Sequence, residues 1–153
     1  MAVVKRLLQD PRVDPSAFDN EALIQTIENR LPYQNEAQQL KMIEILLKDP
    51  RVDPSALDNE ALRLASEARE FAVVERLLED KRVDPNTHKN LALKAAITKG
   101  DFKLIKRIAQ DERVDLLDDA HAVITLARQY KYQPYITKYL EDMLLKKYNR
   151  YVP

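Results

Sequence analysis

The 153-residue sequence has no cysteine and a single glycine, and these two scarcities exclude several kinds of chemistry. Without cysteine there is no disulfide staple and no thiolate metal site. One glycine does not allow a glycine-rich loop that cradles phosphate groups. No apolar run approaches the roughly 20 residues of a membrane span, and no signal peptide opens the sequence. We therefore expect a soluble protein of the cytoplasm.

The sequence also lacks a net charge, because 25 basic residues balance 25 acidic ones. Such a chain has no global field that attracts nucleic acid or a membrane surface. Residues 119–153 depart from this balance, with six basic side chains against three acidic ones. A solvated C-terminal face explains this excess about as well as an acidic partner does, so nucleic-acid binding is the weakest of the binding hypotheses.

What the sequence does have is a repeated phrase, Arg-Val-Asp, which occurs four times. The intervals between the copies are 39, 31 and 31 residues, and the flanking residues repeat with them. Periods of roughly 20–50 residues indicate a solenoid, in which each unit buries its apolar face only against its neighbours. We treat 1–153 as one domain and divide it into a partial unit, an insertion-bearing unit, two regular units and a cap: 1–18, 19–57, 58–88, 89–118 and 119–153.

One regular unit shows the plan. Asn59 is expected to cap a first helix, which carries a narrow stripe of small apolar residues. That stripe consists of Ala61, Leu62, Ala65 and Ala68. After a break at 69–70, a second helix carries a bulkier stripe of Val73, Val74, Leu77 and Leu78. Because Pro85 cannot continue a helix and favours extended geometry at Asp84, each unit is predicted as helix, turn, helix and extended finger.

Other units vary this plan. The next one places the only glycine, Gly100, in the turn between its helices. In the C-terminal cap His121 takes the place of the capping asparagine, and Pro134 opens a longer helix that is predicted to run to about Tyr148. The insertion falls around Tyr33.

Residues 59–65, followed by 73–78, resemble an ankyrin repeat. The 31-residue spacing and the Asp-Pro-Arg-Val-Asp-Pro phrase are similar to the shortened variant that is abundant in giant viruses and their protist hosts. The family's Thr-Pro-Leu-His is absent, and only Gly100 preserves the usual glycine of the turn. The resemblance implies an all-α, ankyrin-like α-solenoid with short extended fingers and a helical C-terminal cap. It also implies protein binding without a cofactor, in the host cytoplasm if the protein is viral.

The resemblance further implies a concave binding surface, formed by the finger tips and the exposed sides of the first helices. One tip position carries four different side chains: Phe18, Leu57, His88 and Asp118. The candidate first-helix positions are Gln25, Arg63, Glu67, Lys94 and Thr98, and the insertion adds Tyr33. The apolar Phe18 and Leu57 either anchor a partner or fold back over the first helix, and the sequence favours neither.

Catalysis and metal binding have little support. His88 and His121 lie 33 residues apart, and neither has a carboxylate at a fixed helical spacing in a cleft-like context. Asp118 and Asp119, near Asp115, form an acidic cluster that lacks EF-hand or zinc spacing. We predict a protein that is not an enzyme, with no catalytic, metal or cofactor residue and no small-molecule substrate.

The Arg-Val-Asp phrase is open to two interpretations. Four copies at a regular interval would form a ladder that could serve as a binding stripe. The interpretation we favour is a structural joint, in which the valine packs under the finger, the aspartate satisfies turn amides and the arginine pairs with a neighbouring carboxylate.

Both ends of the chain are unusual. The first residues align with the second helix of a unit, so the chain begins inside a repeat, as a shortened gene or as a fragment of a longer array. Its Val3, Val4, Leu7 and Leu8 should leave apolar surface exposed, for self-association or for docking a neighbour. Six of the seven tyrosines lie in the last 24 residues, where a cap is favoured over a dedicated binding face.

The leading hypothesis is therefore a non-enzymatic protein–protein interaction module, a scaffold that presents finger tips and first helices. The alternative is a structural or assembly protein that associates through its apolar N-terminal end and its tyrosine-rich C-terminal end.

Overall fold

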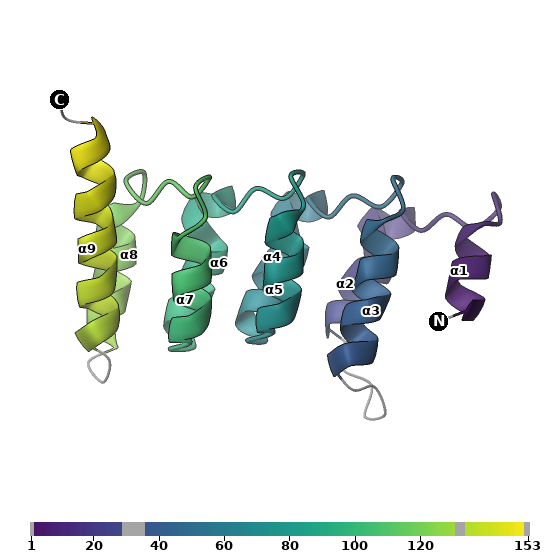
Figure 1. The fold of residues 1–153 in the computed structure, drawn as a ribbon, viewed down its shortest axis with the longest axis horizontal. Helices are drawn as coiled ribbons and strands as arrows, with labels where there is room; N and C mark the ends of the chain where they lie inside the picture. The colour runs from purple at the N-terminus through teal and green to yellow at the C-terminus, as the bar shows by residue number, and fades with distance from the viewer. Residues whose placement is uncertain (1, 29–35, 131–133, 152–153) are drawn as a thin grey trace.

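The protein is all-helical in the part of the chain that the computed structural model describes, residues 2–28, 36–130 and 134–151. These residues form nine helices and no strand (Figure 1). The helices are α1 (Ala2–Leu8), α2 (Ala17–Glu28), α3 (Glu36–Leu47), α4 (Ala56–Glu67), α5 (Phe71–Glu79), α6 (Thr87–Thr98), α7 (Phe102–Ala109), α8 (Ala120–Gln129) and α9 (Pro134–Tyr151). The predicted succession of helix pairs and the predicted helix after Pro134 are thus confirmed.

The helices stand in one row and in two layers, with the two chain ends at opposite ends of the row (Figure 1). One layer holds α2, α4, α6 and α8, and the other holds the odd-numbered helices. Contacts run along each layer, α2 to α4 to α6 to α8 and α3 to α5 to α7 to α9, and across each pair. Each helix pair is therefore packed mainly against the pairs beside it, as the 31-residue period predicts.

The hydrophobic core is continuous and lies between the two layers of helices. Ala61, Leu62 and Ala65 are buried as predicted, and so are the four large residues of α5. Burying a valine or leucine side chain contributes roughly 1.5–3 kcal/mol, so these stripes supply much of the stability. Ala68 is exposed, which corrects the prediction that it belongs to the stripe. It lies beyond the last residue of α4, where the chain already turns away.

The turns between paired helices are closed by left-handed residues. Gly100, with φ 65°, ends the α6 side of its turn, and Asp101 N–H donates to Ala96 O at 3.1 Å. Arg69, with φ 61°, takes the same position after α4, and Glu70 N–H donates to Ala65 O at 2.9 Å. A left-handed residue after a helix lets the chain reverse while the last carbonyls keep partners. Both predicted turns are confirmed.

Each first helix of a regular pair opens with a left-handed turn that the sequence did not indicate. Leu57, Asp58 and Asn59 have φ 51°, 56° and 61°, and the right-handed helix follows them. In α2 the left-handed residues are Phe18, Asp19 and Asn20. Asparagine and aspartate tolerate this region, but residues such as phenylalanine and leucine pay roughly 1–2 kcal/mol there. The surrounding structure must therefore hold phenylalanine and leucine in this conformation.

The last helix closes one end of the stack. Ile136 and Leu140 of α9 are buried, and the Phe102 ring meets Tyr135 and Tyr139 edge-on at 5.0 and 5.4 Å between centroids. Lys147 Nζ donates to the Val114 carbonyl. These contacts support the capping role that the sequence predicts for this tyrosine-rich segment.

None of the helices in the described part of the chain is both long enough and apolar enough to cross a membrane.

Candidate interaction surface

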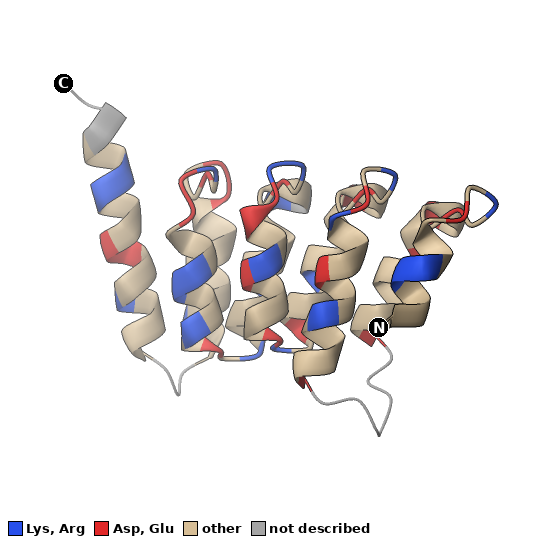
Figure 2. Ribbon diagram, turned by 45° about the vertical axis from the view of Figure 1, so that its right-hand side comes forward, with Lys and Arg blue, Asp and Glu red and all other residues tan. Residues whose placement is uncertain are grey.

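The segments that follow α1, α3, α5 and α7 all lie along one edge of the stack (Figure 1). We call them the joints: residues 10–15, 49–54, 80–85 and 111–116. Each is closed by a turn, as in the Val83 N–H to Asp80 O bond of 3.2 Å, rather than by strand. The fingers are thus more tightly turned than the extended segments predicted from sequence. Charges of both signs recur at the same place in each joint (Figure 2).

Within each joint the first aspartate pairs with the arginine two residues later. In the third joint, Arg82 donates from Nε and from its backbone N–H to Asp80 Oδ1, both at 3.0 Å. The side-chain bond from Arg82 lowers the pKa of Asp80, and the same bond raises the pKa of Arg82. The second aspartate accepts turn amides, as Asp53 Oδ1 accepts Ser55 N–H at 2.9 Å. The predicted arginine–carboxylate pair and the predicted aspartate turn bonds are confirmed.

The arginines also bond to the preceding unit. Arg82 donates from Nη1 to Val52 O at 2.6 Å and from Nη2 to Leu47 O at 3.2 Å. The other arginines bond in the same way, Arg51 to Val13 O and Leu8 O, and Arg113 to Val83 O and Leu78 O. The guanidinium therefore links two successive joints and the C-terminal end of a second helix.

The valines of the second, third and fourth joints are buried, which confirms that they pack beneath the connecting segments: Val52, Val83 and Val114. The bonds from the arginines to carbonyls of the preceding unit were not predicted from the sequence. The sequence feature that could have indicated these bonds is that every copy of the phrase carries arginine and none carries lysine. Only the planar, forked guanidinium group reaches a carboxylate and two carbonyls together.

The buried asparagines also join neighbouring units, which corrects the prediction that they cap their own helices. Asn59 Oδ1 accepts the N–H of Asp84 at 2.8 Å, and Asn59 Nδ2 donates to Thr87 Oγ1 at 2.6 Å. Asn20 Oδ1 accepts the N–H of Asp53 at 2.7 Å in the same way. The left-handed backbone turns the asparagine side chain toward the next unit, where it satisfies a joint amide.

The predicted cap at His121 is also wrong. His121 is exposed in the first turn of α8, and the residue at the capping position is Asp119.

The predicted tip residues lie at the left-handed turns or close to a joint. Phe18 is 87% exposed and Leu57 is 57% exposed. Neither folds back over its first helix, and both side chains are exposed to solvent. Asp118 is exposed just after the fourth joint. His88 lies in α6, and the structure describes its backbone only.

The predicted first-helix positions form contacts within the chain. Arg63 lies between two carboxylates, donating to Glu60 Oε2 at 2.6 Å and to Glu67 Oε1 at 2.6 Å. The bond to Glu60 is the main cause of the raised pKa of Arg63. Lys94 of α6 forms an ion pair with Asp119 at the start of α8. The ion pairs of Arg63 and Lys94 hold these side chains in place along the layer of α4, α6 and α8, whose surface is polar at these positions.

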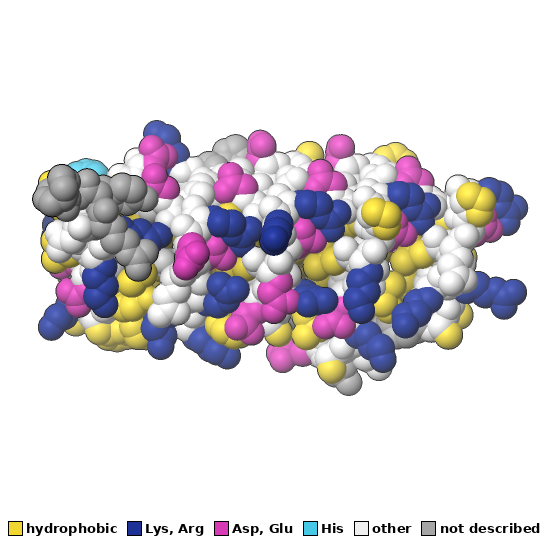
Figure 3. Space-filling model, turned by 45° about the horizontal axis from the view of Figure 1, so that its top comes forward, with side chains coloured by type: hydrophobic (Ala, Val, Ile, Leu, Met, Phe, Trp, Pro, Cys, Tyr) yellow, Lys and Arg dark blue, Asp and Glu magenta, His cyan; other side chains and the backbone are white. Residues whose placement is uncertain are grey.

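The remaining predicted residues contribute less. Thr98 Oγ1 donates to the Lys94 carbonyl at 2.9 Å, and Gln25 Nε2 donates to Glu21 Oε1 at 2.7 Å. Tyr33 lies outside the described residues. The space-filling view over the joints shows charged side chains of both signs with separate apolar patches (Figure 3).

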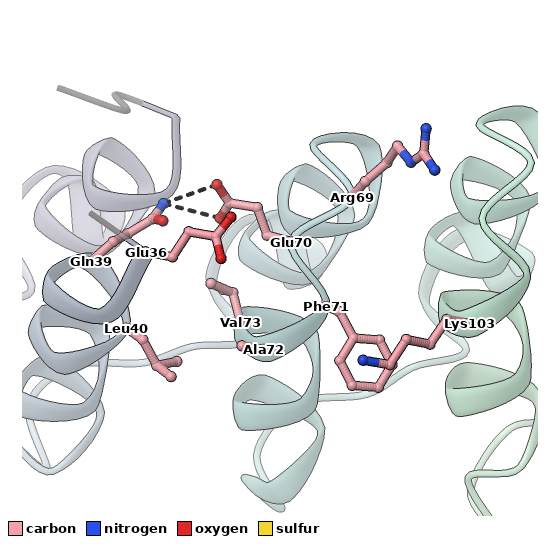
Figure 4. A pocket seen from close by; sticks show the side chains of 9 residues that line it. All are labelled: Glu36, Gln39, Leu40, Arg69, Glu70, Phe71, Ala72, Val73 and Lys103. Atoms are coloured by element: carbon pink, nitrogen blue, oxygen red, sulfur yellow. Dashed lines mark hydrogen bonds between the residues drawn. The ribbon is translucent and has the colours of Figure 1, made fainter. Parts of the chain in front are cut away.

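A pocket of about 260 Å³ lies near the helix turns, at the edge opposite the joints (Figure 4). Its buried Glu70 accepts from Gln39 Nε2 at 3.0 and 3.1 Å, and the same nitrogen bonds to Thr26 O at 3.1 Å. Lys103 Nζ lies 3.5 Å from the centre of the Phe71 ring. These contacts link α2, α3, α5 and α7. The polar side chains that line the pocket therefore have a structural role in the packing of neighbouring units. The pairing of Glu70 with Gln39 was not predicted from the sequence.

Among the described residues, no group of three or more His, Asp or Glu side chains is placed to hold a metal ion. What the arrangement offers is a rigid row of joints with two exposed apolar side chains held on left-handed backbone. Comparisons with protein-family models, with curated proteins and with solved structures found no match to this chain.

Proposed function

We propose that this protein is an ankyrin-like α-solenoid and a protein-binding module without enzymatic activity. In this proposal the partner lies along the joint edge, on a concave surface formed by the tips and the outer sides of the first helices. Phe18 and Leu57 anchor the partner, and the polar positions around them, such as Arg63, select it. Because the scaffold is held by bonds between units, little ordering is needed on binding.

The observation that carries the proposal is the exposure of Phe18 and Leu57 on left-handed backbone. A large apolar residue at positive φ is costly, and exposing it gains nothing from the core. Strained, exposed residues of this kind cluster at binding sites. The same arrangement in two adjacent units points to one continuous surface with two anchors.

The test is affinity capture from a lysate of the cells in which the protein is made, with mass spectrometry of the retained proteins. The variant carries Phe18→Asn and Leu57→Asn, because asparagine accepts left-handed geometry and removes the apolar contact. We expect a protein that the original chain retains and the folded variant loses. Leu145→Asn is the matched control, since Leu145 is an exposed leucine on α9.

Retention of the same proteins by the original chain and by the tip variant would contradict binding at the tips. Loss of a protein from the Leu145 variant alone would move the binding surface to the C-terminal end.

A second candidate function is assembly through the two ends of the stack. It is favoured by the exposed apolar side chains there, Val3 and Leu7 on α1 and Leu145 and Tyr148 on α9. Sedimentation velocity over a hundredfold range of concentration tests it. A mass that rises with concentration supports assembly, and a constant monomer mass rejects it.

A further inference from the structure

The two exposed apolar tips, Phe18 and Leu57, belong to the two units whose first helices are acidic. The helix α2 carries three acidic side chains and no basic one, and α4 carries three acidic side chains and one basic one, Arg63. The next first helix, α6, carries two lysines and no acidic side chain, and its tip residue is His88. The apolar tips and the carboxylates therefore occur together in two units and are both missing from the third.

The acidic side chains occupy the same three repeat positions in both units, and these positions are Asp19, Glu21 and Glu28 in α2, Asp58, Glu60 and Glu67 in α4, and Lys89, Leu91 and Thr98 in α6. In α4 two of them bond to Arg63. In α2 the position of Arg63 holds the buried Ile24, so the carboxylates there do not serve to hold an arginine. Because α6 packs against its neighbours without any of the three, the fold does not require them.

The exposure of this surface does not depend on where a unit stands in the row. Leu57 belongs to a unit with neighbours on both sides, since α4 packs against both α2 and α6, and its side chain is still 57% exposed. Asp58 and Glu67 of the same helix are exposed as well. An apolar tip beside carboxylates is thus open to solvent in the interior of the stack.

The geometry of the repeat sets the spacing of the tips. Phe18 and Leu57 occupy the same position of two adjacent units whose first helices are in contact, and packed helices lie roughly 8–10 Å apart. On each helix the two glutamates are seven residues apart, as Glu60 and Glu67 are, which places them on one face. The surface therefore presents two apolar tips, roughly 10 Å apart, beside two rows of carboxylates.

We propose that the segment bound at these tips is a basic amphipathic helix, with two apolar residues seven positions apart and lysine or arginine side chains beside them. A rise of about 1.5 Å per residue places the two apolar residues roughly 10 Å apart on one face, which matches the tips. In an extended strand, residues on one face lie roughly 7 or 13 Å apart, and neither spacing fits. This partner class rests on the proposed function, because it occupies the same surface.

Charge favours this occupant over other classes of partner. The formal charge is −3 on α2 and, with three acidic side chains and one basic one, −2 on α4. Lysine or arginine side chains of a partner would meet these carboxylates and speed its association. An acidic segment, a nucleic acid or an anionic membrane surface would bring like charges together, which is unfavourable.

The test uses three fluorescently labelled synthetic peptides of about 18 residues, which is long enough for an alanine-rich sequence to be helical in isolation. Each has two leucines seven positions apart, and the positions beside them are lysine in the first peptide, glutamine in the second and glutamate in the third. The full chain is titrated into each, and anisotropy is followed. We expect the lysine peptide to bind saturably and at least about tenfold more tightly than the other two, and to weaken by about threefold or more between roughly 50 and 300 mM salt.

Variants of the chain separate the apolar contact from the charges. Leu57→Asn keeps a residue that accepts left-handed geometry and should weaken the lysine peptide by about tenfold, as loss of an apolar anchor does. Asp19→Asn with Glu28→Gln should weaken it by about threefold to tenfold and leave the glutamine peptide unchanged. Glu44→Gln with Asp142→Asn removes two charges from α3 and α9, in the other layer, and is the matched control. Urea midpoints of all variants show that they are folded.

Absence of saturable binding of the lysine peptide, equal binding of the three peptides, or binding that Leu57→Asn does not weaken would overturn the basic helix as the partner. Tighter binding of the glutamate peptide would assign the tips to an acidic segment instead. None of these results contradicts the proposed function, which fails when the tip variant and the original chain retain the same proteins from the lysate.

Discussion

Arg82 donates from Nη1 to the backbone carbonyl of Val52, the valine of the preceding Arg-Val-Asp phrase, at 2.6 Å. The phrase is therefore repeated because each copy bonds to the one before it. Its arginine holds a carboxylate in its own joint and carbonyls in the neighbouring joint. Charged hydrogen bonds are stronger than neutral ones, and here they repeat along the stack where a small unit has little core of its own.

Replacing one of these arginines should destabilise the stack at a defined interface. We expect Arg82→Ala to lower the free energy of unfolding by about 1.5–3 kcal/mol, because it removes the bonds to Val52 and Leu47. Arg12→Ala is the matched control: it removes the same intra-joint pair but no contact between units, and a fully exposed pair contributes little to stability. Urea unfolding measures both variants. Equal losses would show that the pair within the joint, not the bond between units, matters.

The asparagine bridges predict a second difference between units. Asn59 bonds to both Asp84 and Thr87, whereas Asn90 donates to the Asp115 carbonyl and its buried Oδ1 has no hydrogen-bond partner among the described residues. Asn59→Ala leaves the Asp84 N–H without its acceptor and removes a residue suited to positive φ. We expect it to cost about 2–4 kcal/mol, and Asn90→Ala to cost less.

Thermal and urea unfolding of the two asparagine variants test this order. Asn59→Gly separates the two causes, since glycine keeps the left-handed backbone and loses only the bonds. If Asn59→Gly were as stable as the original chain, the bridge to Asp84 would carry no stability and the backbone alone would explain the asparagine.

The helix pairs, the arginine–aspartate pair within each joint and the buried valines could be predicted from the sequence because they repeat. A nearly fixed period, two apolar stripes per unit and a proline after α1, α3 and α5 leave little choice of element or order. Val52 and Val83 recur between charged residues, which already indicates burial beneath a turn. The pairing of Arg51 with Asp49 follows from the same short phrase.

The left-handed turns could not be predicted, because local preference opposes them. Leu57 disfavours positive φ, and what keeps it there is the long-range bonding of Asn59 to the next unit. The same reason explains the wrong prediction of asparagine caps, since an asparagine before a helix normally caps it. Lys147 was missed because it occurs once, outside the period, and only the folded chain brings it to Val114.

The turns between paired helices give a third prediction. Gly100 and Arg69 occupy equivalent positions with φ 65° and 61°. Gly100→Ala should destabilise by about 1–2 kcal/mol, because a Cβ is unfavourable in left-handed geometry. Arg69→Gly should stabilise by about 0.5–1 kcal/mol on relief of the same strain. Its ion pair with Asp101 at 3.3 Å involves an exposed arginine and offsets little of this. Opposite shifts in the urea midpoint are expected, and shifts of the same sign would contradict the argument.

The joint aspartates predict loss of stability in acid. Bonds from Arg82 and Arg113 lower the pKa of Asp80 and Asp111 in the folded chain, while the unfolded carboxyl titrates near about 3.9. Protons therefore bind the unfolded state first, so this stabilisation is complete above about pH 4 and is lost as the pH falls through the lowered folded values. Urea midpoints measured between neutral pH and about pH 3 should therefore fall most steeply below about pH 4.

Asp111→Asn should lower the stability near pH 7 and flatten the fall below about pH 4, because the variant no longer takes up that proton on unfolding. Asp142→Asn, at an exposed position on α9, is the charge-matched control and should leave the acid slope close to that of the original chain. An acid slope that Asp111→Asn does not flatten would mean that other carboxylates, outside the joints, govern the loss of the folded state in acid.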